Sequence, residues 1–250
     1  DDFISNVPRW CLWLRDTDLA DLREFPAIVQ RVKAVKRFRA ASKSAPTRKL
    51  ARTPTRFHVE FVPTGSYLLI PRHSSEKRLY IPMGFLDKDS FPGDSCLVVP
   101  SATLFHFGIL TSRTHMAWVR HVCGRLESRF RYSNKLVYNN FPWPQDVPEK
   151  RKSSVEAAAQ GVLDARAKFK GRTLDDLYHP LVMPKDLYVA HRLLDRSVDR
   201  CYRREPFPSD HARVEFLFDL YQRLTAPLTT PAKSRRRTAR PAATPASPPA

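Results

Sequence analysis

The glycines of this chain are few and widely spaced along its 250 residues. There are seven of them, and no two lie within eight residues of each other. A dinucleotide-binding turn or a phosphate-binding loop needs several residues without a Cβ close together, because there the backbone itself approaches the phosphates. The sequence therefore argues against a self-contained nucleotide-binding fold.

The charge of the chain is strongly unbalanced. Lys and Arg number 43 against 25 Asp and Glu, which gives a net charge of +18 and a pI of about 10.2. Such a surplus indicates a polyanionic partner, either a nucleic acid or an acidic membrane surface. Apolar residues make up 42% of the chain, enough for a hydrophobic core. No apolar run approaches the ~20 residues of a membrane-spanning helix, so we expect no membrane among the partners.

The positive charge is concentrated between residues 31 and 56, where ten Lys and Arg occur without an acidic residue. Ile28, Val32 and Val35 follow helical spacing within 27–41, which predicts a helix with a basic face. Ten like charges repel one another unless a partner neutralises them; the alternative is a solvated helix face followed by a loop. We predict phosphate contacts from Arg31, Lys33, Lys36, Arg37, Arg39, Lys43, Arg48, Lys49 and Arg52.

The segment from residue 57 to residue 100 has the pattern of short strands. β-Branched and aromatic runs alternate there with clusters of Pro, Gly and Ser. This alternation is typical of strands joined by turns. The runs that we predict as strands are 57–62, 67–71, 78–82 and 96–100.

A helix is expected over 112–123, with Gly124 at the position after its C-cap. The run that follows, as far as Tyr138, alternates in side-chain character and predicts an extended segment. The aromatic block Asn139–Pro144 can continue neither a helix nor a central strand, because two of its residues are prolines. We therefore expect a domain boundary close to this block.

The remainder of the chain is predicted to be helical. Ser153 and Glu156 fit a capping box ahead of a first apolar stripe, and further stripes follow over 187–201 and 214–224. Residues 226–250 hold six Pro, five Lys or Arg and no aromatic residue, a composition typical of disorder. The predicted fold class is α+β: a mixed β-sheet domain with flanking helices over 1–147, a small all-α domain over 148–225 and a disordered basic tail over 226–250.

Three charged side chains follow Gly124 at alternate positions. In an extended segment, Glu127, Arg129 and Arg131 would project from one face. Glu can accept a hydrogen bond from cytosine N4, and Arg can bind guanine O6 and N7 together in the major groove. The pattern is compatible with reading of a C·G pair, although on spacing alone a cross-strand salt bridge on a solvated sheet is the simpler interpretation.

Signals for catalysis and for metal binding are weak. His115 and His121 lie six residues apart and match no zinc motif. The block Asn140–Trp143 faintly resembles the Asn-Pro-Pro-aromatic motif of amino-methyltransferases, which needs two successive prolines around the flipped base. Phe141 stands at the first proline position. We therefore expect no metal site and no catalysis from this chain alone.

Blocks of sequence spread over residues 8 to 224 carry a family resemblance, and the most specific is Val137–Pro144, which ends in Phe-Pro-Trp-Pro. Other matching blocks are Trp10–Leu14, Arg31-Val32, Ala51–Pro54, Ser74–Pro82, Phe107–Ser112, His115–Trp118, Gly124–Leu126, Arg131–Ser133, Leu177-Tyr178, Met183-Pro184 and Ala190–Asp195. Together they resemble the MmeI-like type IIL restriction–modification proteins and their SAM-dependent DNA methyltransferase relatives.

This resemblance implies a target recognition domain and a helical C-terminal domain of a protein that methylates adenine N6 within a short DNA site. It also implies base-reading roles for Glu127, Arg129 and Arg131, which precede the Tyr132-Ser133 pair, and for Ser95. The chain lacks the Asn-Pro-Pro-aromatic motif, the SAM loop and a nuclease core. We therefore expect double-stranded DNA as the partner and no cofactor in this chain, with SAM bound by the methyltransferase domain of a parent polypeptide or of a separate catalytic subunit.

Other interpretations stay open at this point. One is the C-terminal part of a split or truncated adenine methyltransferase that acts by complementation. Another is a non-catalytic basic protein that binds RNA or single-stranded DNA through its aromatic residues, and a third is a remnant without retained function. The four cysteines show no Cys-x-x-Cys spacing, so we expect reduced thiols and a cytoplasmic, nucleoid-associated bacterial protein.

Overall fold

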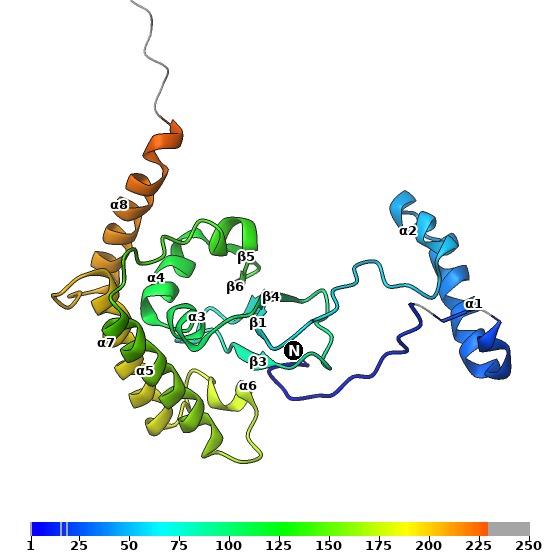
Figure 1. Ribbon diagram of the computed structural model, residues 1–250, viewed down its shortest axis with the longest axis horizontal. Coiled ribbons are helices and arrows are strands. Elements are labelled where there is room, and N and C mark those ends of the chain that lie inside the picture. Colours follow the sequence, from blue (N-terminus) through cyan, green and yellow to red (C-terminus); the bar gives the residue numbers. More distant parts are fainter. Residues whose placement is uncertain (1, 16, 19, 230–250) are drawn as a thin grey trace, which may run out of the picture.

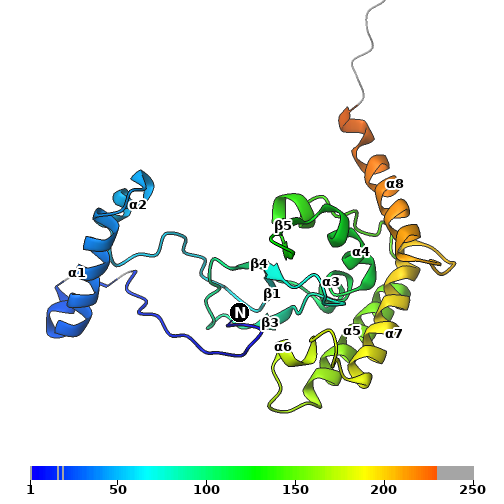
Figure 2. The ribbon, with the colours of Figure 1, turned by 180° about the vertical axis from the view of Figure 1, so that it is seen from behind.

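The structure is a computed structural model that describes residues 2–229 apart from 16 and 19 (Figure 1). The chain forms a body, which holds the strands and most of the helices, and a helical arm that stands away from it. Two extended segments connect the arm to the body, and the view from behind shows the same separation (Figure 2). The arm, residues 20–56, consists of η1 (Asp21–Glu24), α1 (Pro26–Ala40), α2 (Ala45–Lys49) and η2 (Leu50–Arg52).

The helix predicted at the start of the basic stretch is confirmed as α1. It begins at Pro26, whose fixed φ and missing N–H suit the first helical position. The helix contacts α2 and η2 and contains no fully buried residue. The Arg39 guanidinium donates to the carbonyl oxygens of Leu50, Thr53 and Arg56, which ties the returning chain to the helix. The arm is therefore held largely by its own contacts.

The first sheet is antiparallel and has a buried central strand. It consists of β1 (Tyr67–Pro71), β3 (Gly84–Leu86) and β4 (Cys96–Pro100), in the order β3-β1-β4. All five residues of β1 are buried, as expected for a nearly continuous apolar run. The strands predicted over 67–71 and 96–100 are confirmed with the same bounds.

The second sheet is smaller and is also antiparallel. It consists of β2 (His73–Ser74), β5 (Gly124–Leu126) and β6 (Arg129–Arg131), in the order β2-β6-β5. The prediction of one extended segment as far as Tyr138 is therefore only partly right. The chain forms a β-hairpin there and then the single π-helical turn η3 (Asn134–Tyr138).

The strand predicted over 57–62 is wrong, because this segment has no neighbouring strand. It connects the arm to β1 without regular structure. Its apolar side chains do not pack as those of a strand: Val59 is 75% exposed, and the ring of Phe57 stacks on Trp13 of the other connecting segment. A β-branched and aromatic run forms a strand only where it can pair.

The strand predicted over 78–82 is wrong for a different reason. Tyr80 and Ile81 are buried as expected, but the helical part of the body buries Tyr80. The Tyr80 ring stacks on His191 with 4.0 Å between centroids, and its hydroxyl donates to Asp195 at 2.8 Å. The apolar run is a buried connection between β2 and β3.

The remaining helices are α3 (Leu104–Leu110), α4 (Arg113–Val122), α5 (Glu149–Ala167), α6 (Leu174–Leu177), α7 (Lys185–Tyr202) and α8 (Asp210–Thr229). Helices α5 and α7 lie side by side and both contact α3, whereas α8 packs on α4 (Figure 1). The helices predicted over 112–123, 187–201 and 214–224 are thus confirmed within α4, α7 and α8.

The start of α5 differs from the prediction. The capping box at Ser153 and Glu156 is wrong, because the helix begins at Glu149 and those residues lie inside it. Pro148 occupies the N-cap position in an extended conformation, with φ −58° and ψ 144°. Glu149 places a negative charge in the first turn, where the helix dipole favours it.

The C-terminal end of the described chain is helical. Helix α8 continues past residue 225 to Thr229, so the predicted start of the tail at residue 226 is wrong. Residues 230–250, the rest of the predicted disordered tail, lie outside the described residues. The α+β class, with the strands followed by helices, is confirmed, but the predicted mixed sheet is wrong, because both sheets of the described residues are antiparallel. The division between residues 147 and 148 stays a prediction. In the described part of the chain, no helix combines the length and the apolar character that crossing a membrane requires.

The Phe-Pro-Trp-Pro block forms a packed junction at the predicted boundary. The buried Phe141 ring contacts His115 and Trp118 of α4 edge-on, with 4.6 and 6.3 Å between centroids. The carbonyl oxygen of Pro142 accepts a hydrogen bond from the Tyr202 hydroxyl of α7 at 3.1 Å. The block therefore joins the two parts of the body through aromatic packing.

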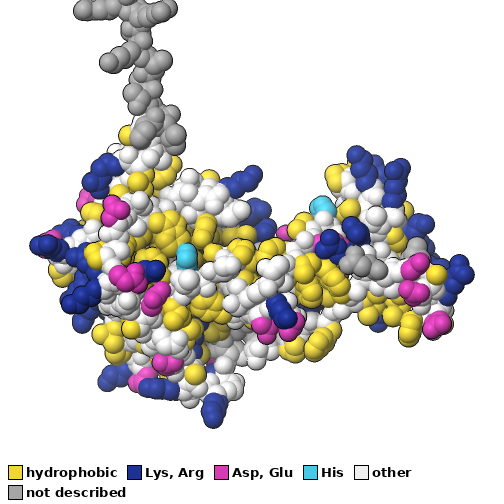
Figure 3. Space-filling model, in the orientation of Figure 1, with side chains coloured by type: hydrophobic (Ala, Val, Ile, Leu, Met, Phe, Trp, Pro, Cys, Tyr) yellow, Lys and Arg dark blue, Asp and Glu magenta, His cyan; other side chains and the backbone are white. Residues whose placement is uncertain are grey.

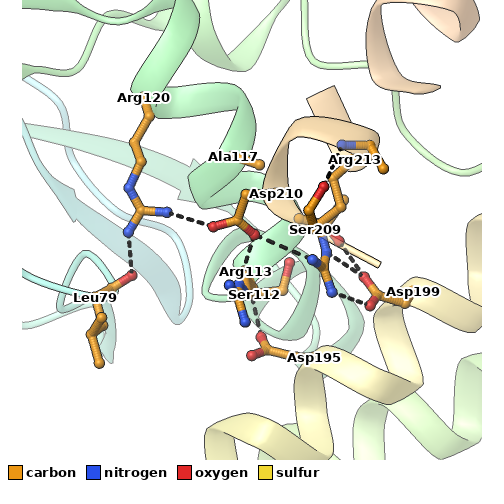
Figure 4. A network of polar contacts seen from close by, with 12 residues as sticks. Leu79, Ser112, Arg113, Ala117, Arg120, Asp195, Asp199, Ser209, Asp210 and Arg213 are labelled. Carbon is orange, nitrogen blue, oxygen red and sulfur yellow. Dashed lines mark hydrogen bonds and ion pairs between the residues drawn. The ribbon is translucent and has the colours of Figure 1, made fainter. Parts of the chain in front are cut away.

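Charged side chains also join α4 to α7 and α8 (Figure 4). One carboxylate oxygen of Asp210 lies 2.6 Å from Arg113, and the other lies 3.6 Å from Arg120. The buried Arg213 pairs with Asp199 of α7. Removal of one partner from such a buried pair leaves an uncompensated charge, at a cost of about 3–5 kcal/mol. These contacts fix how the helical part sits on α4.

Two glycines allow a matched test of the helix packing. A Cβ on Gly108 of α3 would lie 2.7 Å from Val155 Cγ1 and 3.3 Å from Ala159 Cβ, whereas a Cβ on Gly161 of α5 would meet no heavy atom within 4 Å. We expect Gly108→Ala to lower the free energy of unfolding by about 1–3 kcal/mol through overpacking. Gly161→Ala should raise it by about 0.5–1 kcal/mol through helix propensity. Urea unfolding measures both changes, and equal effects of the two would contradict the packing.

The buried Asp195 makes a pH-dependent prediction. Burial raises the pKa of its carboxyl from 3.8 to about 6. The folded protein thus holds this proton more tightly than the unfolded chain, so the contribution to stability is complete below pH 4 and declines as the pH rises through 6. A shift of about two units corresponds to at most about 3 kcal/mol. Asp195→Asn cannot titrate, and we expect the wild type to lose that amount relative to the variant between pH 4 and pH 7, measured by urea unfolding; parallel stability curves would refute it.

Candidate nucleic-acid interface

Three of the four predicted base-reading residues, Glu127, Arg129 and Arg131, lie together on the exposed β5–β6 hairpin. Leu126 pairs with Arg129, so Glu127 and Ser128 form the two-residue turn between the strands. Glu127 has φ 56°, a left-handed conformation that such tight turns require. The expectation of one straight segment is therefore wrong at Glu127, which lies in the turn. Arg129 and Arg131 lie in β6 with exposed side chains, as predicted.

Glu127 and Arg129 form an ion pair on this hairpin. Their side chains approach to 2.9 Å and are 76% and 48% exposed. The salt bridge of the simpler interpretation is thus present. It joins the turn residue Glu127 to Arg129 at the start of β6 and does not link two adjacent strands. An exposed ion pair contributes about 0–1 kcal/mol. A ligand with matching donors and acceptors can therefore replace it at little cost.

The opposite face of the hairpin is anchored in the core. Phe130, between the two exposed arginines, is 1% exposed, and the Arg125 guanidinium lies over its ring at 4.1 Å. The Tyr132 hydroxyl is hydrogen-bonded to His115 Nε2 of α4 at 2.8 Å. Burial lowers the pKa of His115 to about 3, so this imidazole is neutral at neutral pH. The exposed arginines are thus carried on a well-supported backbone.

Ser95 lies in the same region although it precedes a strand of the other sheet. It is exposed in the turn before β4, and its carbonyl oxygen accepts from the backbone N–H of Arg72 at 2.9 Å. A cavity of about 280 Å³ is lined by residues that include Ser95, His73, Leu126 and Arg129. The fold therefore brings Ser95 and Arg129 to one cavity from positions far apart in the sequence.

Three further polar residues at this edge escaped the sequence analysis. Arg72 Nη2 lies 3.6 Å from the exposed carboxylate of Asp94, and His73 lies opposite Arg131 in the β2–β6 ladder. A basic pair directly after the buried run of β1 was the available signal. The sequence could not show that β2 would pair with β6, which is what brings Arg72 and His73 to the hairpin.

The predicted phosphate-binding residues lie on the arm. Arg39 is half-buried and the others are exposed. Arg39 and Arg48 have roles in the arm itself, because Arg48 donates to the carbonyl oxygens of Ser42 and Lys43 just as Arg39 ties down the returning chain. The side chains without such backbone contacts are those of Arg31, Lys33, Lys36, Arg37, Lys43, Lys49 and Arg52.

The hairpin and the arm border a common indentation of the molecular surface. Both ribbon views place the β5–β6 hairpin between α4 and the arm (Figures 1 and 2). The outline in Figure 3 is indented between arm and body, and Lys and Arg side chains gather along the adjacent edge of the arm. The arrangement presents positive charge from two separate units to the same space.

The described residues offer little to a metal ion or a nucleotide cofactor. No group of three or more His, Cys, Asp or Glu side chains among them could hold a metal ion. The glycines stand singly, as in the sequence, so this part of the chain builds no glycine-rich loop around a phosphate.

Comparison with known families matches the chain in two consecutive parts. The family model of the MmeI target recognition domain matches residues 1–145, and that of the MmeI C-terminal domain matches residues 147–229. The chain is 41% identical over 224 residues to DNA methyltransferase A of Bacillus subtilis (strain 168), which covers 90% of this chain and 25% of the relative.

A solved structure of the type IIL restriction-modification enzyme MmeI in complex with DNA is similar to this chain over the same share of its length. It has a TM-score of 0.87 and 44% sequence identity, over 90% of this chain and 30% of that one. The two family models identify the chain as a target recognition domain followed by a C-terminal domain. The chain belongs to the MmeI family and spans 25–30% of the length of these two relatives.

Proposed function

We propose that this chain recognises a short sequence in double-stranded DNA on behalf of a DNA methyltransferase. The observation that carries the proposal is the exposed group Glu127, Arg129, Arg131 and Ser95, which lies at one edge of two sheets and is supported from beneath by buried aromatic residues. The solved relative bound to DNA and the relative named as a DNA methyltransferase support the same function.

The chemistry of this group suits a C·G base pair. The Arg129 guanidinium can donate two hydrogen bonds to guanine O6 and N7, and the Glu127 carboxylate can accept from cytosine N4. The two groups lie side by side on the hairpin, 2.9 Å apart in their ion pair, so one base pair could meet both. Arg131 and Ser95 would contact neighbouring bases from the same edge.

The arm supplies the contacts that do not depend on sequence. Its seven Lys and Arg side chains without backbone contacts would bind phosphates and so fix the position of the hairpin along the duplex. A cavity of about 500 Å³ beside the arm is lined by apolar residues that include Trp10, Val32 and Phe57, and also by Arg31. We assign the exposed basic side chains of the arm, rather than this cavity, to DNA.

The complete reaction would require a longer polypeptide or a second subunit. We propose adenine N6 methylation with SAM bound outside this chain, within a restriction–modification enzyme or a methyltransferase acting by complementation. Presentation of the target base is what this chain would contribute. DNA is then the working partner, so we propose a cytoplasmic, nucleoid-associated location.

Binding to single strands by the Phe-Pro-Trp-Pro block is the weaker function. Phe141 is buried against α4, so its ring cannot stack on an unpaired base without opening the core. Competition between duplex DNA and single-stranded RNA of equal length at fixed salt compares the two functions directly. We expect the duplex to win.

The base-reading role predicts the effect of Arg129→Ala. Selection of bound duplexes from a randomised library should yield a motif for the wild type and a motif relaxed at one base pair for the variant. Loss of a bidentate contact corresponds to about 1–3 kcal/mol of discrimination at that pair. Uniform weakening of binding to all sequences would refute the assignment, and Arg196→Ala on α7 serves as a control for lost charge.

The phosphate-binding role predicts a change in salt dependence. The plot of log K for DNA binding against log salt concentration has a negative slope. Lys36→Gln and Arg37→Gln should each make this slope less steep by about 0.9 per lost phosphate contact. The base preference should stay the same, because these side chains are expected to contact only the backbone. Lys168→Gln, at the end of α5 and away from the arm, is the matched control. An unchanged slope in both arm variants would exclude α1 from the interface.

A further inference from the structure

We propose that His73 is a further base-reading residue, whose imidazole donates a hydrogen bond to the acceptor edge of a purine next to the bases contacted by Arg129 and Arg131. The inference rests on the proposed DNA-reading function and extends it to a strand outside the hairpin. The juxtaposition of β2 with β6 is the observation from which it starts.

The register of the second sheet places His73 on the reading face. His73 lies directly opposite Arg131, and Ser74 lies directly opposite Phe130. Residues opposite each other in an antiparallel pair project from the same face. Ser74 and Phe130 are both buried, so they mark the inner face. His73 and Arg131 therefore share the outer face, and Arg129, two residues along β6, shares it too.

The imidazole is available to a ligand. His73 is half-buried and lines the 280 Å³ cavity together with Ser95 and Arg129. Within the described part of the chain, its ring nitrogens have no hydrogen-bond partner. A polar ring that faces a cavity without a partner can form a new hydrogen bond without breaking an old one.

The charged surroundings decide which base edge the ring meets. Arg129, Arg131 and Arg72 lie near it, the Asp94 carboxylate lies beside Arg72, and Asp2 and Cys96 line the same cavity. Burial, followed by the three arginines, lowers the pKa of His73 below 6.5. A neutral imidazole keeps one N–H donor. Purine N7 and guanine O6 are acceptors that match both this donor and the neighbouring guanidinium groups.

The test is a selection of bound duplexes from a randomised library with the full chain. We compare the wild type, Arg131→Ala, His73→Ala and His73→Gln, with His211→Ala on the exposed side of α8 as the matched control. Loss of one hydrogen bond predicts a drop in discrimination of about fivefold at one base pair for His73→Ala. His73→Gln keeps a donor and should retain part of the preference, and His211→Ala should select the wild-type motif.

The outcomes separate this inference from the function on which it rests. If Arg131→Ala relaxes the motif and both His73 variants select the wild-type motif, the His73 inference is overturned and the reading function stands. Uniform weakening by His73→Ala, with an unchanged motif, also overturns it. If the wild type selects no motif, the reading function itself fails. Thermal unfolding of each variant checks the fold, and His73→Gln decides the matter if His73→Ala does not fold.

Discussion

Hydrogen bonds from consecutive residues of α4 hold the hairpin and the helical part in a common frame. The Thr114 hydroxyl donates to Asp199 of α7 at 2.7 Å, and His115 on the next position bonds to Tyr132 beside the hairpin. One turn further on, the Trp118 indole N–H donates to a carbonyl oxygen of η3 at 3.1 Å. All three side chains are buried. Breaking any of these three hydrogen bonds would leave a further buried polar atom unpaired, so the orientation of α4 fixes what lies on both sides of it.

The alternation of β6 separates stability from recognition. Phe130 points inward and contributes roughly 1.5–3 kcal/mol by burial, whereas its two neighbours are exposed and contribute little to folding. Their side chains can therefore be chosen for what they bind. The left-handed turn at Glu127 works in the same way, because it sets the hairpin geometry through the backbone and leaves the carboxylate exposed. The exposed side chains of the hairpin can thus be substituted without disturbing the buried residues that support it.

The sequence predicted those features that depend on local patterns. Apolar spacing located α1, α4, α7 and α8, the buried strand β1 and the half-buried strand β4. The same patterns failed where burial came from distant contacts: Tyr80 is buried by α7, and the apolar residues of 57–62 found no neighbouring strand. The site followed the same division. The spacing singled out Glu127, Arg129 and Arg131 but favoured a salt bridge, and the family resemblance implied the base-reading role for them and for Ser95. The proximity of Ser95 and His73 to the hairpin results from long-range pairing such as that of β2 with β6 and could not be inferred from neighbours in the sequence.

The separation of the arm from the body has a consequence for how strongly the chain can hold a duplex. If the arm and the hairpin both bind DNA as proposed, they would act as a chelate, since engagement of one raises the local concentration of the other. The gain in affinity depends on how the two units are connected. Here two separate extended segments attach the two ends of the arm to the body. Double attachment limits the range of positions that the arm can sample. The arm would therefore contact phosphates at a set distance along the duplex from the bases that the hairpin contacts.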